Sequence, residues 1–147
     1  MDNLRDLYQE VILDHNKRPR NFRMLESCTH RADGHNPLCG DRVTVFVEVD
    51  DAVIKAVTFQ GQGCAISTAS ASLMTTMLTG KTVAEAERLF GQFYDLVTGH
   101  SQPSSAMGKL AVLAGVRDYP SRVKCATLAW HAVQAALHNQ TEPVVTE

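Results

Sequence analysis

Residues 41–64 read DRVTVFVEVDDAVIKAVTFQGQGC, and this stretch decides the fold. Every second residue from Val43 to Val49 is valine, a period of two that predicts a strand with one buried face. The pair of aspartates that follows marks a turn, and residues 53–60 form a second run of high β-propensity. We therefore expect the two runs to pair as a β-hairpin.

Helical periodicity appears on both sides of this hairpin. Residues 61–63 (GQG) end the second strand, and from Ala65 onward apolar residues share one face. Thr82 and Glu85 form a capping box that opens the next helix. The whole pattern predicts helices over residues 4–15, from 65 to a stop at Gly80, from Thr82 to a stop at Gly99, over 109–116 and over 121–138.

These elements predict one α+β domain over residues 1–147, with a small antiparallel sheet of about three strands and helices packed on one face. The length suits a single domain. Residues 27–33 are ambiguous and supply a candidate short edge strand, whereas the turn formers in residues 34–41 indicate a loop. Trp130 is expected to pack against the sheet, and residues 139–147 are predicted to be a mobile tail.

Composition narrows the class of function. The 14 Lys and Arg and 16 Asp and Glu give a formal net charge of −2, which argues against a general nucleic-acid binder. A basic cluster between Lys17 and Arg23 is interpreted as a solvated loop. No stretch reaches the roughly 18 apolar residues of a membrane span, and the polar start lacks the features of a secretory signal. We therefore expect a cytoplasmic protein whose four cysteines form no structural disulfides.

Three cysteines stand at the ends of predicted elements, where side chains can converge at one rim of a domain. Cys39 lies in a loop flanked by Gly and Pro, Cys64 in a glycine-rich corner, and Cys125 near the start of a helix. Asp41 follows Cys39 by two residues. Three thiolates and a carboxylate suit a tetrahedral zinc site, and thiolates equally hold iron–sulfur clusters. Spacing alone leaves metal binding and buried structural thiols equally favoured.

The charges around the three cysteines and Asp41 support a metal site. Three thiolates and one carboxylate carry −4, so a divalent ion leaves −2 to be compensated. Arg122 and Lys124 lie beside Cys125 in the sequence, and free N–H groups at helix starts favour anionic ligands. Cys28 fits no ligand pattern and is interpreted as a core or edge-strand residue, and His15 as a helix cap or surface residue.

The residues around the cysteines strongly resemble the IscU/SufU family of iron–sulfur cluster assembly proteins, which is similar to the NifU N-terminal domain. The resemblance covers residues 4–138 and rests on NPLCGDR at 36–42, GQGCAIS at 61–67, PSRVKCATLAW at 120–130 and the opening LYQEVILDH at 7–15. It implies an α+β domain that works with a cysteine desulfurase. It also implies that the metal ligands are Cys39, Asp41, Cys64 and Cys125.

Two features place the chain nearer the SufU branch of this family. Lys124 stands where IscU-type chains usually have histidine, and extra material around residues 80–108 resembles the SufU insertion. Residues 119–124 also depart from the proline-rich chaperone motif of IscU proteins. The branch implies a zinc-dependent sulfur acceptor rather than a cluster scaffold. Its partners would be a SufS-like desulfurase and downstream iron–sulfur scaffold or acceptor proteins, with neither nucleic acid nor membrane.

Three functions remain open from the sequence, and so does the question of whether the protein is an enzyme. The first is a zinc-binding sulfurtransferase in which Cys39 receives persulfide sulfur and Arg122 steadies the site, with Cys125 as the second candidate acceptor. The second is a scaffold on which iron or a transient [2Fe–2S] cluster occupies the same ligands, Asp41 making the cluster labile. The third is a non-catalytic interaction module stabilised by zinc.

Overall fold

The computed structural model describes residues 3–37, 40–102, 105–140 and 142–146. It contains the predicted hairpin, formed by β2 (Asp41–Asp50) and β3 (Val53–Gln62), which pair antiparallel. Asp51 and Ala52 connect the strands, and both take a positive φ, as the tight turn of a two-residue hairpin requires. The predicted hairpin within residues 41–64 is therefore confirmed.

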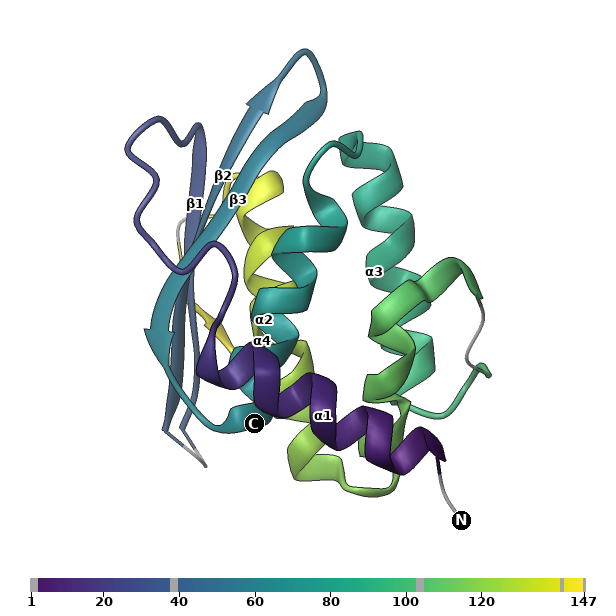
Figure 1. Cartoon of the computed structure of the whole chain (residues 1–147). Coiled ribbons are helices and arrows are strands. Elements are labelled where there is room, and N and C mark those ends of the chain that lie inside the picture. Colours follow the sequence, from purple (N-terminus) through teal and green to yellow (C-terminus); the bar gives the residue numbers. More distant parts are fainter. Residues whose placement is uncertain (1–2, 38–39, 103–104, 141, 147) are drawn as a thin grey trace.

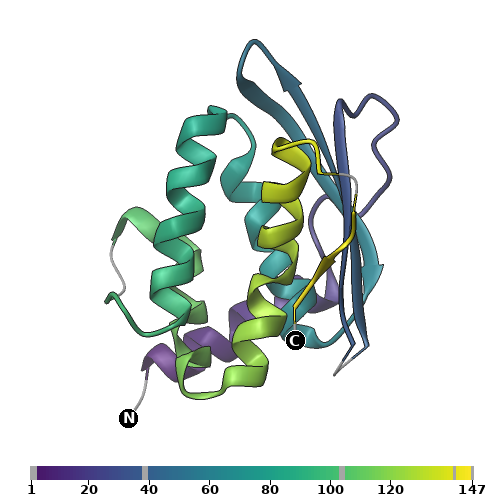
Figure 2. The same cartoon turned by 180° about the vertical axis from the view of Figure 1, so that it is seen from behind.

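Two further strands complete the sheet, and here the sequence prediction was partly wrong. Strand β1 (His30–Asn36), predicted as an edge strand, pairs antiparallel with β2 but begins later than predicted and includes residues that read as turn formers. The short strand β4 (Val144–Val145) pairs parallel with β1 inside the segment predicted as a mobile tail. The sheet therefore has four strands in the order β3-β2-β1-β4 and is mixed rather than antiparallel with three strands. Figure 2 shows β4 running along the edge of the sheet.

The helices lie on one side of the sheet, which confirms the predicted α+β class (Figures 1 and 2). The helices α2 and α4 contact the strands, while α1 and α3 pack outside them. A 3₁₀ segment, η1, is kinked at Gly108 and lies beside α1 and α3. No described helix has the length and apolar character needed to span a bilayer. The bounds of these elements are Asn3–Lys17 for α1, Ala65–Leu78 for α2, Val83–Val97 for α3, Ser105–Asp118 for η1 and Pro120–Leu137 for α4.

The core fills the space between the sheet and the helices. Val45 and Val47 of β2 are fully buried, as the valine alternation predicts. Trp130 is also buried, but its ring stacks on Phe93 of α3 with centroids 4.4 Å apart. The contacts of Trp130 are with helices, Phe93 of α3 and Ser70 of α2, and its packing against the sheet stays a prediction. The Thr82–Glu85 capping box is present at the start of α3.

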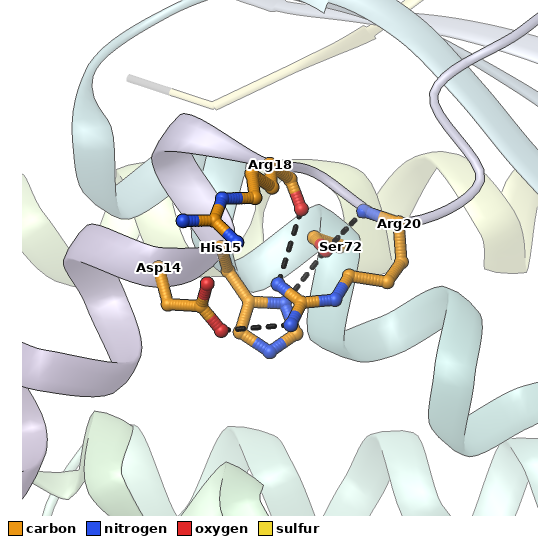
Figure 3. A network of polar contacts seen from close by, with 5 residues as sticks. All are labelled: Asp14, His15, Arg18, Arg20 and Ser72. Atoms are coloured by element: carbon orange, nitrogen blue, oxygen red, sulfur yellow. Dashed lines mark hydrogen bonds and ion pairs between the residues drawn. The ribbon is translucent and has the colours of Figure 1, made fainter.

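A polar network ties the end of α1 to α2 (Figure 3). His15 Nδ1 lies 2.7 Å from the Ser72 hydroxyl, and the backbone N–H of Arg20 donates to the same oxygen at 2.8 Å. The Arg20 guanidinium forms an ion pair with Asp14 at 2.7 Å. His15 is only 3% exposed, so its assignment to a cap or the surface was wrong. Arg20, part of the predicted basic cluster, is an anchor between elements as well as a surface charge.

Candidate metal centre

The candidate site lies where β2 begins, β3 ends and α2 begins. Asp41 is the first residue of β2, Cys64 is the N-cap of α2, and Cys125 lies on the second turn of α4. Their ligand atoms all lie within 4.8 Å of one another. Three of the four predicted ligands therefore converge. Cys39, the fourth, lies outside the described residues.

Asp41 and Cys64 are joined directly. The backbone N–H of Cys64 donates to Asp41 Oδ1 at 2.9 Å, and the Cys64 thiol lies 3.7 Å from Asp41 Oδ2. The carboxylate is buried, since Asp41 is only 1% exposed. The pairing of Arg42 with Gln62 in the sheet brings the two chain segments together at this end. The hairpin register thus positions one carboxylate oxygen beside one thiol.

Glycine is required at the corner between β3 and α2. A Cβ on Gly63 would lie 2.7 Å from Asp41 Oδ1, closer than real Cβ contacts. Gly61 has φ +147°, and a Cβ there would lie 2.1 Å from the carbonyl oxygen of Arg42. The sequence GQG was interpreted only as a strand end. The structure adds that its two glycines allow the corner to close on the Asp41 carboxylate.

The Cys64 thiol is activated by its surroundings. Its pKa is lowered to about 7, first by a hydrogen bond from Cys125 and then by backbone N–H groups at the start of α2. The Ser67 N–H contributes by donating to Cys64 Sγ at 3.4 Å. Burial and the Asp41 charge oppose this shift. These surroundings therefore favour the thiolate form of Cys64 over that of an ordinary cysteine.

The donor set fits zinc. In a tetrahedral site with Zn–S near 2.3 Å and Zn–O near 2.1 Å, a sulfur and an oxygen ligand lie about 3.6 Å apart. The distance between Cys64 Sγ and Asp41 Oδ2 is 3.7 Å. Cys64 is exposed, whereas Asp41 and Cys125 are buried, so the site is reached from the Cys64 side. Thiolate ligands of this kind also hold iron–sulfur clusters.

Arg122, the other predicted functional residue, lies in the first turn of α4 and is exposed. Its guanidinium lies over the ring of Tyr119 at 4.4 Å from the centroid. A role for Arg122 in sulfur transfer stays a prediction. Cys28 is half-buried before β1 and lies outside the group of Asp41, Cys64 and Cys125 among the described residues, so its exclusion from the site stays a prediction.

Ser67 is a contributor that the sequence analysis did not single out. It stands three residues after Cys64, which is the spacing at which a backbone N–H bonds to an N-cap side chain. The signal was available, but cysteine is an unusual cap and was assessed only as a ligand. Cys64 thus combines a capping role with its position in the candidate site.

Comparison with known proteins agrees with this geometry. Residues 7–126 match the family model described as the NifU-like N-terminal domain. The zinc-dependent sulfurtransferase SufU of Bacillus subtilis is 40% identical over 90% of this chain and 90% of its own length. The iron–sulfur cluster assembly scaffold protein IscU of Streptococcus pyogenes is 39% identical over 93% of this chain and 86% of its own length.

Solved structures show the same fold. A protein from Fervidobacterium islandicum, described as an iron–sulfur cluster assembly scaffold for the SUF system, superposes with a TM-score of 0.84 at 33% identity. The match covers 90% of this chain and 97% of that one. The N-terminal part of a NifU-like protein from Brucella abortus gives a TM-score of 0.83 at 25% identity, covering 92% and 94% of the two chains. Sequence motifs, fold and full-length similarity together show that the chain belongs to the NifU-like N-terminal domain family, with IscU and SufU proteins as its relatives.

Proposed function

We propose that this protein is a zinc-binding sulfur acceptor in iron–sulfur cluster assembly and receives persulfide sulfur from a cysteine desulfurase of the SufS kind. The observation that carries the proposal is the convergence of Asp41, Cys64 and Cys125 within 4.8 Å, with the Cys64 side open to solvent. The name of the Bacillus subtilis relative, a zinc-dependent sulfurtransferase, supports it. Because this chemistry needs reduced thiols, the proposal places the protein in the cytoplasm.

In this proposal Cys39, Asp41, Cys64 and Cys125 hold the zinc ion. Bound zinc would supply positive charge without redox chemistry and keep the thiols deprotonated at neutral pH. Three thiolates, one carboxylate and a divalent ion leave a net −2 at the site. Arg122 and Lys124, on the same helix as Cys125, supply compensating positive charge in its first two turns.

The transfer step is a thiol–persulfide exchange with Cys39 as the nucleophile. The Cys39 thiolate attacks the outer sulfur of the desulfurase persulfide, a new S–S bond forms, and the original S–S bond breaks. The desulfurase cysteine leaves as a thiolate, and the proton of the persulfide remains with the transferred sulfur. No external oxidant or reductant is consumed.

The surroundings favour Cys39 over the other two cysteines as acceptor. Cys64 caps α2 and Cys125 lies within α4, so both are tied to helical backbone. Gly40, next to Cys39 in sequence, has φ +77° and nothing within 4 Å of where its Cβ would be. In this proposal the segment flanked in sequence by Pro37 and Gly40 is the one that exchanges a ligand without breaking a helix. Downstream, an iron–sulfur scaffold or acceptor protein would take the sulfur.

A second function is favoured by the relative from Streptococcus pyogenes, which is a scaffold protein of nearly equal identity. The same four residues would hold a [2Fe–2S] cluster as cargo, with the Asp41 oxygen as the exchangeable ligand. A purely structural zinc module fits less well. Closed structural sites use Cys and His, whereas this site contains a carboxylate and an exposed cysteine.

The proposal is tested by purifying the full chain without added metal and measuring metal content and absorption. Colourless protein with one zinc per chain supports the sulfur acceptor, and brown protein with visible charge-transfer bands supports the scaffold. The chain is then mixed with a cysteine desulfurase and cysteine, alkylated and digested, and the added sulfur is mapped by mass spectrometry. Sulfur on Cys39 is expected; sulfur on Cys125 alone would contradict the assigned acceptor, and none on any cysteine would contradict the proposed function.

A further inference from the structure

We propose that Ser70 is a positioning residue of the metal centre, because its buried hydroxyl joins α2 to α4 and so fixes the separation of the Cys64 and Cys125 thiols. The inference rests on the proposed function, since it takes both cysteines to be ligands of one metal ion. It concerns the second layer of the site, six residues beyond Cys64 along α2.

The two cysteines belong to different helices, so their separation depends on how those helices pack. The Ser70 hydroxyl donates to the carbonyl oxygen of Ala126 at 2.5 Å, and Ala126 directly follows Cys125. Along α2, Ser70 lies about 9 Å from Cys64, less than two helical turns. A helix of this length moves as a rigid body. Any slip of α2 along α4 at Ser70 would therefore be carried to the Cys64 sulfur.

The bond is held in place by a second one. The indole N–H of Trp130 donates to Ser70 Oγ at 3.1 Å, so this hydroxyl both accepts from and donates to α4. Trp130 is itself fixed by its stacking on Phe93 of α3. Both donor and acceptor capacity of the buried hydroxyl are engaged, which defines its direction. Helices α2 and α4 thus meet in one small polar cluster inside an apolar core, and α3 borders it through the Phe93 ring.

The choice of serine over alanine at buried position 70 is explained by the demands of the metal site. The neighbouring positions 69 and 71 of α2 are alanine, and alanine would fill the space next to α4 without any polar group to satisfy. Apolar contacts are non-directional and tolerate small sliding movements. Metal–ligand distances must hold to about 0.2 Å, so a directional bond between the two ligand-bearing helices serves the site better than apolar packing alone.

Ser72 provides a matched control. It lies on the same helix, is fully buried like Ser70, and also uses its hydroxyl in two contacts. Those contacts go to His15 and to the backbone of Arg20, at the end of α1, and not to α4. Replacing Ser72 with alanine removes a comparable buried network without touching the α2–α4 pairing. Any difference between the two variants at the metal site then reports on position and not on general stability.

The experiment uses the full chain as wild type, Ser70→Ala and Ser72→Ala, each stripped of metal. Co²⁺ is titrated while the thiolate-to-cobalt and d–d bands are recorded, and Zn²⁺ affinity is obtained by competition. Urea unfolding of the metal-free proteins measures the stability loss of each variant. We expect Ser70→Ala to weaken metal binding about 10- to 100-fold and shift the cobalt bands, as for other outer-layer residues. Ser72→Ala should bind cobalt like the wild type.

If Ser70→Ala and Ser72→Ala show the same affinity and the same cobalt spectrum, the inference is overturned. Should Ser70→Ala fail to fold, the pair Ser70→Thr and Ser70→Val replaces it, because the two side chains share a shape and differ in the hydroxyl. Threonine is then expected to bind cobalt more tightly than valine, and equal binding would overturn the inference. A wild type that binds neither metal contradicts the proposed function itself, which separates the two failures.

Discussion

The space beside the Asp41 carboxylate leaves no room for a side chain at position 63. A Cβ on Gly63 would lie 2.7 Å from Asp41 Oδ1, so Gly63→Ala must displace the carboxylate or open the corner. We expect this variant to lose about 10- to 100-fold in zinc affinity, measured by competition with a chelating dye. Gly91→Ala in α3 is the control, because its Cβ meets nothing within 4 Å. Equal zinc affinity in the two variants would show that the corner tolerates a side chain.

The cysteines provide a second test at the residue scale. Cys64→Ser is expected to lower the zinc content of the purified protein and its thermal stability, because metal binding energy is part of folding energy. Cys28→Ser should keep its zinc, since Cys28 is not part of the ligand group. Elemental analysis after gel filtration measures both. A Cys28 variant that loses zinc while the Cys64 variant retains it would refute the ligand assignment.

Single residues also show what the sequence could and could not predict. Cys64 and Cys125 were candidates because each stands at or near the end of a predicted element, whereas the ligand set that includes Asp41 was implied by the family resemblance. The role of Gly63 depends on a contact with Asp41 across the hairpin, and no local pattern records such an approach. His15 was misassigned for a similar reason, because Ser72, its partner, lies 57 residues away in the chain.

At the scale of elements, the contact between α1 and α2 depends on a neutral histidine. The pKa of His15 is lowered from 6.5, first by burial and then by the charge of Arg20. Burial also lowers the pKa of His131, between α3 and α4. As the pH falls, each of these histidines is therefore protonated at a higher pH in the unfolded chain than in the folded protein. The stability that each neutral histidine contributes is therefore fully present above about pH 6.5. It is lost as the pH falls from that value through the lower pKa of the folded protein.

The expected outcome is a free energy of unfolding that decreases between pH 7 and pH 5.5, by at most about 1.4 kcal/mol per pH unit for each histidine. Urea unfolding of the metal-free chain measures it, since protons also compete with metal for the thiolates. His15→Gln removes one titrating group and should reduce the slope. An unchanged slope in that variant would mean that His15 keeps its ordinary pKa in the folded protein.

The helices and strands also show where prediction from sequence periodicity fails. The hairpin and the long helices were predicted because their periodicity is strong over ten or more residues. The end of β1 was misplaced because its residues 34–36 (GHN) resemble a turn, whereas pairing with β2 draws them into the sheet. The two valines of β4 favour a strand but are too few to make a periodic pattern, and their pairing depends on the edge of β1 that β2 leaves open.

For the molecule as a whole, β4 is the segment that returns the end of the chain to the sheet. Val144 is half-buried and packs against the core, and the N–H of Thr146 donates to the carbonyl of His35 at 3.1 Å. We expect Val144→Ala to cost about 1–2 kcal/mol of unfolding free energy and to speed amide exchange in β1. Val145→Ala should change neither, because Val145 is exposed. Hydrogen-exchange mass spectrometry compares them, and equal exchange in β1 would contradict a protective role for β4.

The position of the candidate ligands along the chain has a consequence for biosynthesis. Asp41 and Cys64 meet within a hairpin of local sequence, 23 residues apart, whereas Cys125 is on the last helix. A ribosome delivers the amino-terminal half first, so a nascent chain presents Cys39, Asp41 and Cys64, three of the four proposed ligands, before α4 has been synthesised. In the proposed centre, full coordination would then wait until α4 has been synthesised. The order of elements would therefore couple maturation of that centre to synthesis of α4.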